Sequence, residues 1–280
     1  MIKIFDMSYD PTKKFEELKD KYKKRKLNMF IIGAGALANF VALGIINLKI
    51  GRITIFDQDK VEETNLNRQV LYFDAVGMTK ASTLKKRLKE INPGNIYDYK
   101  LMFFDAKTSG RYFKWFREKP DIIIDCVDNF ETRALLNRLA TKYKIPLISG
   151  GTSPLAGQVM VYFPGMTSCL NCELDIERLA EELERQRQGC TVVPEGSVVT
   201  TNQIVGGLIV GELYRLLSGI LPSSGTIRYI SNDENRVGFV PNGKICNCHL
   251  NSVKIPKKVT SQTKENLFKK LKSFFVEEEV

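Results

Sequence analysis

The sequence predicts an α/β protein whose core is a doubly wound, mostly parallel sheet extended by antiparallel strands. Between residues 28 and 150, short apolar segments alternate with longer segments of helical spacing, the order typical of a parallel sheet covered by helices. Two glycines stand at the first change from strand to helix, as in a Rossmann-like turn. After residue 150, apolar and polar residues alternate, which favours antiparallel strands.

In the first half of the chain, the expected elements follow one another closely. A strand in NMFII (28–32) leads through Gly33 and Gly35 into an apolar helix. The further strands expected here are GRITIFD (51–57), NIYDYKLMF (95–103), DIIIDCVD (121–128) and IPLISG (145–150). The segments with helical periodicity are TKASTLKKRLKEINP (79–93), which stops at Pro93, and ETRALLNRLATKYK (131–144).

The second half is expected to extend the sheet and to form a substrate surface. AGQVMVYFP (156–164) and GTIRYISNDENRVGFVP (225–241) have the alternation of antiparallel strands, and DIERLAEELERQRQG (175–189) predicts a long charged helix. The most apolar long segment, residues 203–221, contains Glu212 and Arg215, which interrupt it too strongly for a bilayer span. We interpret it as a core helix and expect no membrane partner.

Composition and charge distinguish a central domain from two basic ends. A chain of 280 residues with 43% hydrophobic content can bury a full core. We expect one domain over residues 28–250, a basic helical extension over 1–27, and a basic tail over 251–280 with a short amphipathic helix at 264–275. The net charge of +10 is concentrated in these ends, and no zinc-finger, RNP or helix-turn-helix pattern accompanies it. Nucleic acid is therefore not the expected partner.

Cysteine usage indicates metal or thiol chemistry in a reducing compartment. The N-terminal segment MIKIFDMSYDPTKK carries acidic residues early and has no apolar run of signal length, so we expect a cytoplasmic protein. Thiols stay reduced in the cytoplasm, and the six cysteines therefore suggest a metal site or a reactive thiol rather than disulfides.

The glycine turn predicts a nucleotide site. Backbone N–H groups and the helix dipole face a phosphate at such a turn, and Asp57 ends the next strand, close to where a ribose-binding acid is expected. An NAD-dependent oxidoreductase would share these two features. It would not explain the polar stretch DQDKVEETNLNRQ (57–69), which follows directly after a buried strand.

Three motifs in the same order resemble the ThiF, MoeB and HesA superfamily, the adenylating core of ubiquitin-activating enzymes. They are IIGAGALANFVALGIINLKIGRITIFDQDKVEETNLNRQV, then GMTK, then DCVDNFETRALLN, and the resemblance runs from about residue 28 to about 250. It implies ATP-dependent adenylation of the C-terminal glycine of a ubiquitin-like or sulfur-carrier protein that ends in Gly-Gly. It also implies a homodimer.

The resemblance also implies roles for the polar residues. Arg68 and Lys80 would neutralise phosphates, and Asp128 would hold Mg²⁺. Asn65 and Gln69 would orient the triphosphate, Asp57 would contact the ribose, and Asp59 would make contacts on the metal side. The expected ATP-binding set is Gly33, Gly35, Asp57, Asp59, Asn65, Arg68, Gln69, Lys80, Asp128 and Asn129.

Three charged residues of this set also have a purely structural interpretation. Arg68 would be a surface salt-bridge partner, Lys80 a helix-start lysine, and Asp128 an N-cap for the helix after Asn129. The proposed chemistry requires positive charge because an anionic carboxylate must approach an anionic phosphate, and no general base is needed. The single histidine, His249, lies in a cysteine cluster, which disfavours histidine-based acid–base catalysis.

Two cysteine pairs predict a structural zinc site. SCLNC supplies Cys169 and Cys172, and KICNCH supplies Cys246 and Cys248, with His249 next to them. The second pair departs from the common CxxC spacing, so the fourth ligand is either Cys248 or His249. We favour Cys248 because thiolates dominate closed zinc sites.

The two remaining cysteines are expected to differ in reactivity. Cys126 lies in an apolar strand, where burial makes a thiol inert. Cys190 follows a helix that carries Arg185 and Arg187, in the region where activating enzymes carry a thioester or sulfur-transfer cysteine, and nearby cations favour its thiolate. Residues 191–203 would form a crossover under which the partner's tail threads.

These expectations lead to one interpretation with three alternatives. We expect adenylation followed by a thioester on Cys190, with transfer to a conjugating enzyme as one outcome. MoeB-like members stop at the adenylate, and an NAD-dependent oxidoreductase is the alternative of another class. A catalytically silent scaffold that keeps the fold for binding is the third alternative, which the complete set of nucleotide-binding residues disfavours. Many family members donate an arginine to the neighbouring subunit from an N-terminal RY-x-RQ segment; here the chain reads KDKYKKRK, and only Arg25 offers a substitute.

Overall fold

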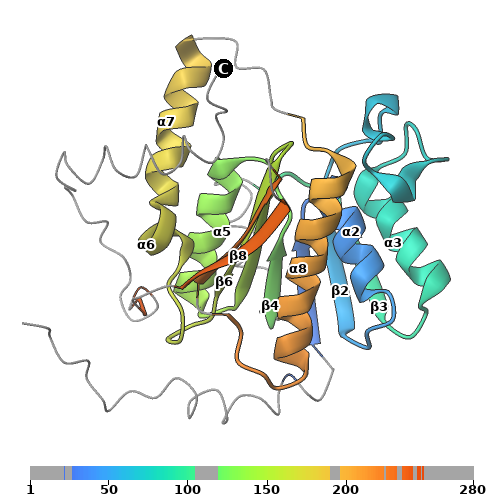
Figure 1. Cartoon of the computed structure of the whole chain (residues 1–280). Helices are drawn as coiled ribbons and strands as arrows, with labels where there is room; N and C mark the ends of the chain where they lie inside the picture. The colour runs from blue at the N-terminus through green and yellow to red at the C-terminus, as the bar shows by residue number, and fades with distance from the viewer. Residues whose placement is uncertain are drawn as a thin grey trace, which may run out of the picture.

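A single mixed sheet organises the molecule, in the strand order β3-β2-β1-β4-β5-β6-β7-β8 (Figure 1). The computed structural model describes residues 22, 27–104, 119–189, 196–223, 225–231, 235–241, 245–246 and 248. The strands are β1 (Leu27–Ile32), β2 (Gly51–Phe56), β3 (Ile96–Lys100), β4 (Ile122–Asp125), β5 (Leu147–Thr152), β6 (Ala156–Tyr162), β7 (Gly225–Ser231) and β8 (Asn235–Pro241). Neighbours from β3 to β5 are parallel, and those from β5 to β8 are antiparallel, as the sequence predicts.

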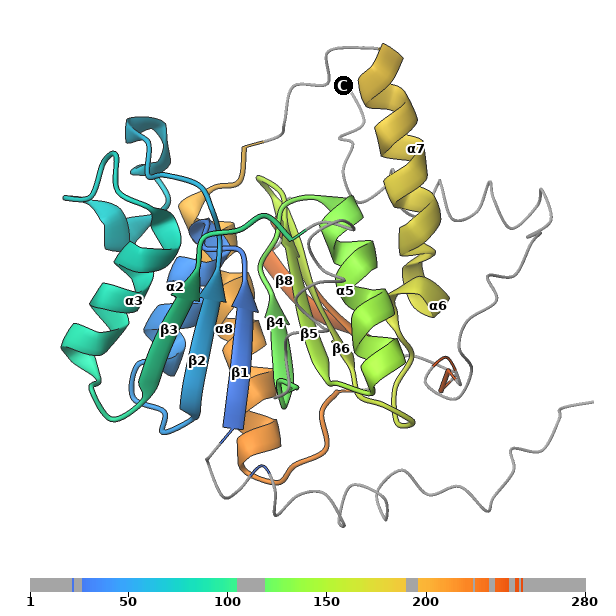
Figure 2. The same cartoon turned by 180° about the vertical axis from the view of Figure 1, so that it is seen from behind.

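Helices cover both faces of the parallel part of the sheet, as the two opposite views show (Figures 1 and 2). The helices are α2 (Ala36–Ile45), α3 (Lys80–Ile91), α5 (Phe130–Tyr143), α6 (Leu170–Leu174), α7 (Ile176–Gly189) and α8 (Val199–Leu217). One apolar core joins α2, α3 and α8 to the sheet, and a second joins α5, α6 and α7 to its other face. Strand β1 is apolar without alternation because it contributes to both cores: Met29 and Ile31 pack in the first, Phe30 and Ile32 in the second.

Three details differ from the sequence expectation. Helix α8 starts four residues before residue 203, at Val199, and ends at Leu217 rather than 221. The predicted helix 175–189 begins at Ile176, because Asp175 adopts a left-handed conformation (φ 52°) that separates it from the short helix α6. Helix α6 was not predicted, since five residues carry too little periodicity to recognise.

The ends of the chain fall largely outside the described residues. The predicted tail and its amphipathic helix, residues 251–280, lie outside them, as does most of the extension 1–27. Tyr22 is the exception: it is buried, and its ring packs edge-on against Phe163 at 5.9 Å between centroids. Among the described helices, none combines the length and the apolar character that crossing a bilayer requires.

Candidate nucleotide site and cysteine cluster

The carboxyl ends of β1, β2 and β4 meet at one edge of the sheet, because neighbouring parallel strands run in register. A cavity of about 510 Å³ lies there. Every residue of the predicted ATP-binding set lines it: Gly33, Gly35, Asp57, Asp59, Asn65, Arg68, Gln69, Lys80, Asp128 and Asn129. Residues that are far apart in the sequence therefore converge at the place where ligands bind in open α/β sheets.

The glycine turn is held in shape by side chains from two other segments. Gly33 has φ +89°, and the N–H of Ala34 donates to Asp57 Oδ2 at 2.7 Å. The hydroxyl of Tyr72, in the 3₁₀ helix η2 (Val70–Tyr72), donates to the carbonyl of Ala34 at 2.7 Å. Burial raises the pKa of Asp57, while the N–H groups of Ala34 and Asp59 oppose that shift. Asp57 therefore shapes the turn as well as bordering the cavity.

Alanine substitutions at the two glycines of the turn are expected to have different effects. A Cβ on Gly33 would lie 2.8 Å from the carbonyl oxygen of Cys126, in a left-handed conformation, whereas a Cβ on Gly35 would meet no protein atom within 4 Å. We expect Gly33→Ala to lower the free energy of unfolding by about 1–3 kcal/mol. Gly35→Ala should change it by less than about 1 kcal/mol and act on nucleotide affinity. Urea unfolding and nucleotide titration of both variants test this pair; equal stability losses would contradict it.

Lys80 is the first residue of α3 and is fixed to the loop after β2. Its backbone N–H donates to the carbonyl of Asp59 at 2.8 Å, and its Nζ lies 3.0 Å from Asp59 Oδ2. The Lys80 side chain is 11% exposed, whereas that of Asp59 is 59% exposed. Lys80 therefore starts a helix, as its purely structural interpretation expected. It also places its ammonium group at the cavity, as its phosphate-binding role would require.

Arg68 and Gln69 both follow the 3₁₀ helix η1 (Glu63–Asn65). Arg68 Nη1 donates to two neutral oxygens of its own loop, the Thr64 carbonyl at 3.0 Å and Asn67 Oδ1 at 2.8 Å. No carboxylate of the described residues pairs with Arg68, so the salt-bridge interpretation is not supported.

Gln69 is buried, and its Oε1 accepts no hydrogen bond within the described part of the chain. A donor on a ligand would satisfy this atom.

The segment after β4 places a carboxylate at the cavity. Asn129, not Asp128, is the N-cap of α5, because Asn129 Oδ1 accepts a hydrogen bond from Thr132 N at 2.8 Å. The capping role suggested for Asp128 is therefore wrong. Asp128 is exposed, and its Oδ1 lies 3.5 Å from Asn129 Nδ2. Its carboxylate is available to a cation, whereas Asn65 Oδ1 is engaged with Glu62 N at 3.2 Å.

Several residues that lie at the cavity were not predicted from the sequence. Arg133 and Asp125 form a buried ion pair beside the cavity, and Arg133 lines it. In the sequence, the pair shows only as an arginine within a helix and an aspartate at the end of an apolar strand, and neither signal is specific. Gly151, Thr152 and Asn202 also line the cavity.

The reactive-cysteine prediction lies outside the described residues, since Cys190 and residues 191–195 are not among them. The predicted crossover is described from Gly196 onward, and Gly196 and Ser197 line the cavity. Cys126 is buried, as expected for an inert thiol, and burial raises its pKa well above the usual value.

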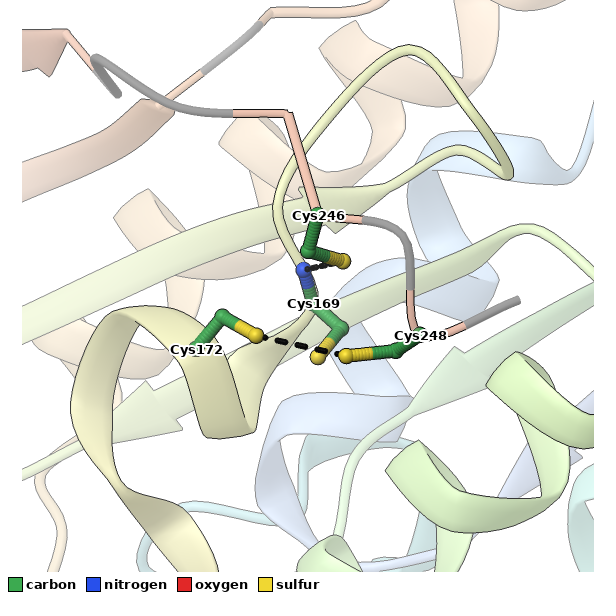
Figure 3. Close-up of side chains that lie close together, drawn as sticks. All are labelled: Cys169, Cys172, Cys246 and Cys248. Atoms are coloured by element: carbon green, nitrogen blue, oxygen red, sulfur yellow. Dashed lines mark hydrogen bonds between the residues drawn. The ribbon is translucent and has the colours of Figure 1, made fainter. Parts of the chain in front are cut away.

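Four cysteines from two distant segments converge (Figure 3). The Sγ atoms of Cys169, Cys172, Cys246 and Cys248 all lie within 4.8 Å of one another. A tetrahedral zinc ion with Zn–S bonds of about 2.3 Å separates its sulfurs by about 3.8 Å, so the group fits such an ion. Cys248 belongs to the cluster through its 3.3 Å contact with Cys172, whereas His249 lies outside the described residues.

The four cysteines of the cluster are coupled by hydrogen bonds. Hydrogen bonds from the side chains of Cys169 and Cys172 lower the pKa of Cys246, and hydrogen bonding to Cys169 and Cys246 raises the pKa of Cys172. Four thiolates at these distances would repel one another, and a bound dication would offset that repulsion.

The structure thus defines a doubly wound α/β protein with a charged cavity at its glycine turn and a separate cysteine cluster. The chain belongs to the ThiF family, whose profile matches residues 12–250. The sulfur carrier protein ThiS adenylyltransferase of Bacillus subtilis is 36% identical over 156 residues, covering 55% of this chain and 45% of that protein. Ubiquitin-like modifier-activating enzyme 5 of Arabidopsis thaliana is 29% identical over 215 residues, covering 71% of this chain and 49% of that enzyme.

Solved structures agree on the fold. The crystal structure of E. coli MccB with AMPCPP and selenomethionine MccA superposes with a TM-score of 0.67 at 21% identity, covering 82% of this chain and 67% of MccB. PaaA superposes with a TM-score of 0.62 at 20% identity, covering 84% of this chain and 86% of PaaA. The chain spans less than half the length of the two curated relatives described above.

Proposed function

We propose that this protein uses ATP to adenylate the C-terminal glycine of a ubiquitin-like or sulfur-carrier protein. One observation carries the proposal: Arg68, Lys80 and Asp128, which are distant in sequence, line a single cavity at the glycine turn. Membership of the ThiF family supports it, as do the names of relatives that are adenylyltransferases or modifier-activating enzymes.

The reaction joins two anions, and the cavity residues address that obstacle. The carrier's terminal carboxylate oxygen attacks the α-phosphorus of ATP, a P–O bond forms, and the bond to the departing pyrophosphate breaks. Arg68 and Lys80 lower the repulsion between the reactants, and the side-chain amide N–H of Gln69 donates to the triphosphate. Asp128 would hold Mg²⁺, and the ion would neutralise phosphate charge. Asp57 binds the ribose, with Asp59 on the metal side.

The cysteine cluster would hold a structural Zn²⁺. Cys169 directly precedes α6 and Cys246 lies beyond β8, so one ion would join two distant segments of the second half. None of the four cysteines lines the cavity at the glycine turn, which supports a structural role rather than a catalytic one.

The expected partner is a narrow peptide tail that ends in Gly-Gly. Gly150, Gly151 and Gly196 line the cavity. A Cβ on Gly196 would meet no protein atom within 4 Å, so the wall there leaves room for a peptide backbone without side chains. The protein would act as a cytoplasmic homodimer, and a conjugating enzyme would accept the activated group where one exists. Arg25, the candidate for an arginine donated across a dimer, lies outside the described residues.

After adenylation, the Cys190 thiolate would attack the acyl carbonyl, form a thioester and release AMP. We expect Cys190→Ala to keep carrier-dependent ATP–pyrophosphate exchange within about threefold of wild type, because the cysteine acts after the exchanged step. The same variant should lose the thiol-reducible covalent adduct completely. The substrates are purified ubiquitin-like proteins that end in Gly-Gly, and mass spectrometry maps the adduct.

Two controls make the outcome decisive. Cys126→Ala removes a buried thiol and should keep both exchange and adduct, while a carrier that lacks its last glycine should support neither. Exchange without any adduct in wild type would favour the MoeB-like reaction, which ends at the adenylate. An adduct that persists in Cys190→Ala would reject the thioester on that residue.

A further inference from the structure

Arg133, near the start of α5, holds the ends of two neighbouring strands together. Its side chain is 8% exposed, and Nε donates to Asp125 Oδ2 at 3.0 Å. Nη2 donates to the carbonyl of Val127 at 2.6 Å, just after β4, and to the carbonyl of Gly150 in β5 at 2.5 Å. One guanidinium group therefore connects the Asp125 carboxylate, the Val127 carbonyl and the Gly150 carbonyl, which lie at the end of β4, just beyond it, and in β5.

Both carboxylate oxygens of Asp125 accept hydrogen bonds. Its side chain is fully buried; Oδ2 also accepts from Ser149 Oγ at 2.7 Å, and Oδ1 accepts from Val127 N at 3.0 Å. Both the N–H and the carbonyl of Val127 are thus fixed by the ion pair. In a low-dielectric interior, such a network has one favourable arrangement, because any displacement leaves a buried charge without its partner.

The residue that follows Val127 is Asp128, whose own carboxylate is exposed at the cavity. Asp128 makes one weak side-chain contact, at 3.5 Å to Asn129, which does not by itself fix its position. The backbone of the Asp128 segment is therefore held from one side by the Arg133–Asp125 pair and from the other by the Asn129 cap of α5.

We infer that Arg133 is a positioning residue that sets the affinity for magnesium-bound nucleotide by fixing the backbone beside Asp128. The inference rests on the proposed function, in which Asp128 holds Mg²⁺. Arg133 acts through Val127 and Asp125, so its effect appears in the magnesium dependence of binding rather than in nucleotide contact as such.

The test is Arg133→Lys in the full-length protein. Lysine keeps a positive charge beside Asp125, but its single nitrogen does not reproduce the fork that reaches Asp125, Val127 and Gly150 together. Calorimetry would measure the affinity for AMPPCP with and without Mg²⁺. We expect about a 10-fold or greater loss with Mg²⁺, and less than about a threefold loss without it.

Arg138→Lys is the matched control, because Arg138 lies on the same helix, is 51% exposed and contacts Glu177 at 3.7 Å. It should leave both affinities unchanged. Equal losses with and without Mg²⁺ in Arg133→Lys, or no loss, would overturn the inference. A wild-type protein that binds no AMPPCP would instead reject the proposed function.

Ser149→Ala covers the case in which Arg133→Lys does not fold. It removes the Ser149 hydrogen bond to Asp125 and leaves the ion pair in place. We expect a smaller loss in the same direction, again confined to binding with Mg²⁺. Unchanged magnesium dependence in a folded Ser149→Ala protein would also overturn the inference.

Discussion

Lys80→Ala is expected to lower carrier-dependent ATP–pyrophosphate exchange by about 100-fold to 1,000-fold. Three cations among the described residues line the cavity, and Arg133 is engaged with Asp125, which leaves Lys80 and Arg68 for a triphosphate. The ammonium group of Lys80 is held at the site by Asp59 at 3.0 Å. Its removal should affect the reaction far more than the fold, because its partner Asp59 is 59% exposed and such pairs contribute little to stability. Radiolabelled pyrophosphate exchange measures the loss.

Lys86→Ala is the control for this prediction. Lys86 lies on the same helix, its side chain is 63% exposed, and it pairs with Glu90 at 3.8 Å. We expect exchange in Lys86→Ala to match wild type. If Lys80→Ala retained exchange within about twofold, electrostatic assistance by this residue would be wrong.

Cys169→Ser is expected to release the proposed zinc ion and to lower the free energy of unfolding by at least about 3 kcal/mol. Cys169 is 1% exposed, and its N–H donates to Cys246 Sγ at 3.1 Å, so the ligand is also part of the packing between α6 and the segment after β8. Elemental analysis should find one zinc per wild-type chain and less in the variant. Denaturant unfolding gives the stability change.

Cys126→Ala is the control that distinguishes the effect of losing the metal from the effect of losing a buried thiol. Cys126 is 6% exposed and lies outside the cluster, so its replacement should cost about 1 kcal/mol and leave the zinc content unchanged. Purified protein without zinc, with an unfolding transition that a chelator does not shift, would reject the structural metal site.

The parallel half of the fold could be predicted from the sequence because β1, β2 and β4 are short, largely apolar and bounded by turns. The run Met29–Ile32 is buried on both faces, which makes it recognisable without alternation. Helix α6 could not be found in this way, since it has only five residues, its N-cap Cys169 makes no side-chain capping hydrogen bond, and its end is a left-handed Asp175 that leaves no periodic pattern.

The cavity residues were predictable where a motif fixes their place at a strand end, as for Gly33, Asp57 and Asp128. The residues that support them were not, because their roles depend on contacts across the sheet. Tyr72 reaches the carbonyl of Ala34, and Arg133 reaches the carbonyl of Gly150, from positions that look like ordinary core and helix residues in the sequence. The alternative N-cap at Asp128 was wrong for a local reason: Asn129 is one residue nearer to Thr132.

The most direct test is a crystal structure of the protein with Mg²⁺ and AMPPCP. We expect the triphosphate to lie at the glycine turn between Arg68 and Lys80, with the magnesium ion on Asp128 and Gln69 Oε1 within hydrogen-bonding distance of a ligand or a bound water. An analogue bound away from these side chains, or a cavity that accepts NAD in preference to AMPPCP, would contradict the account.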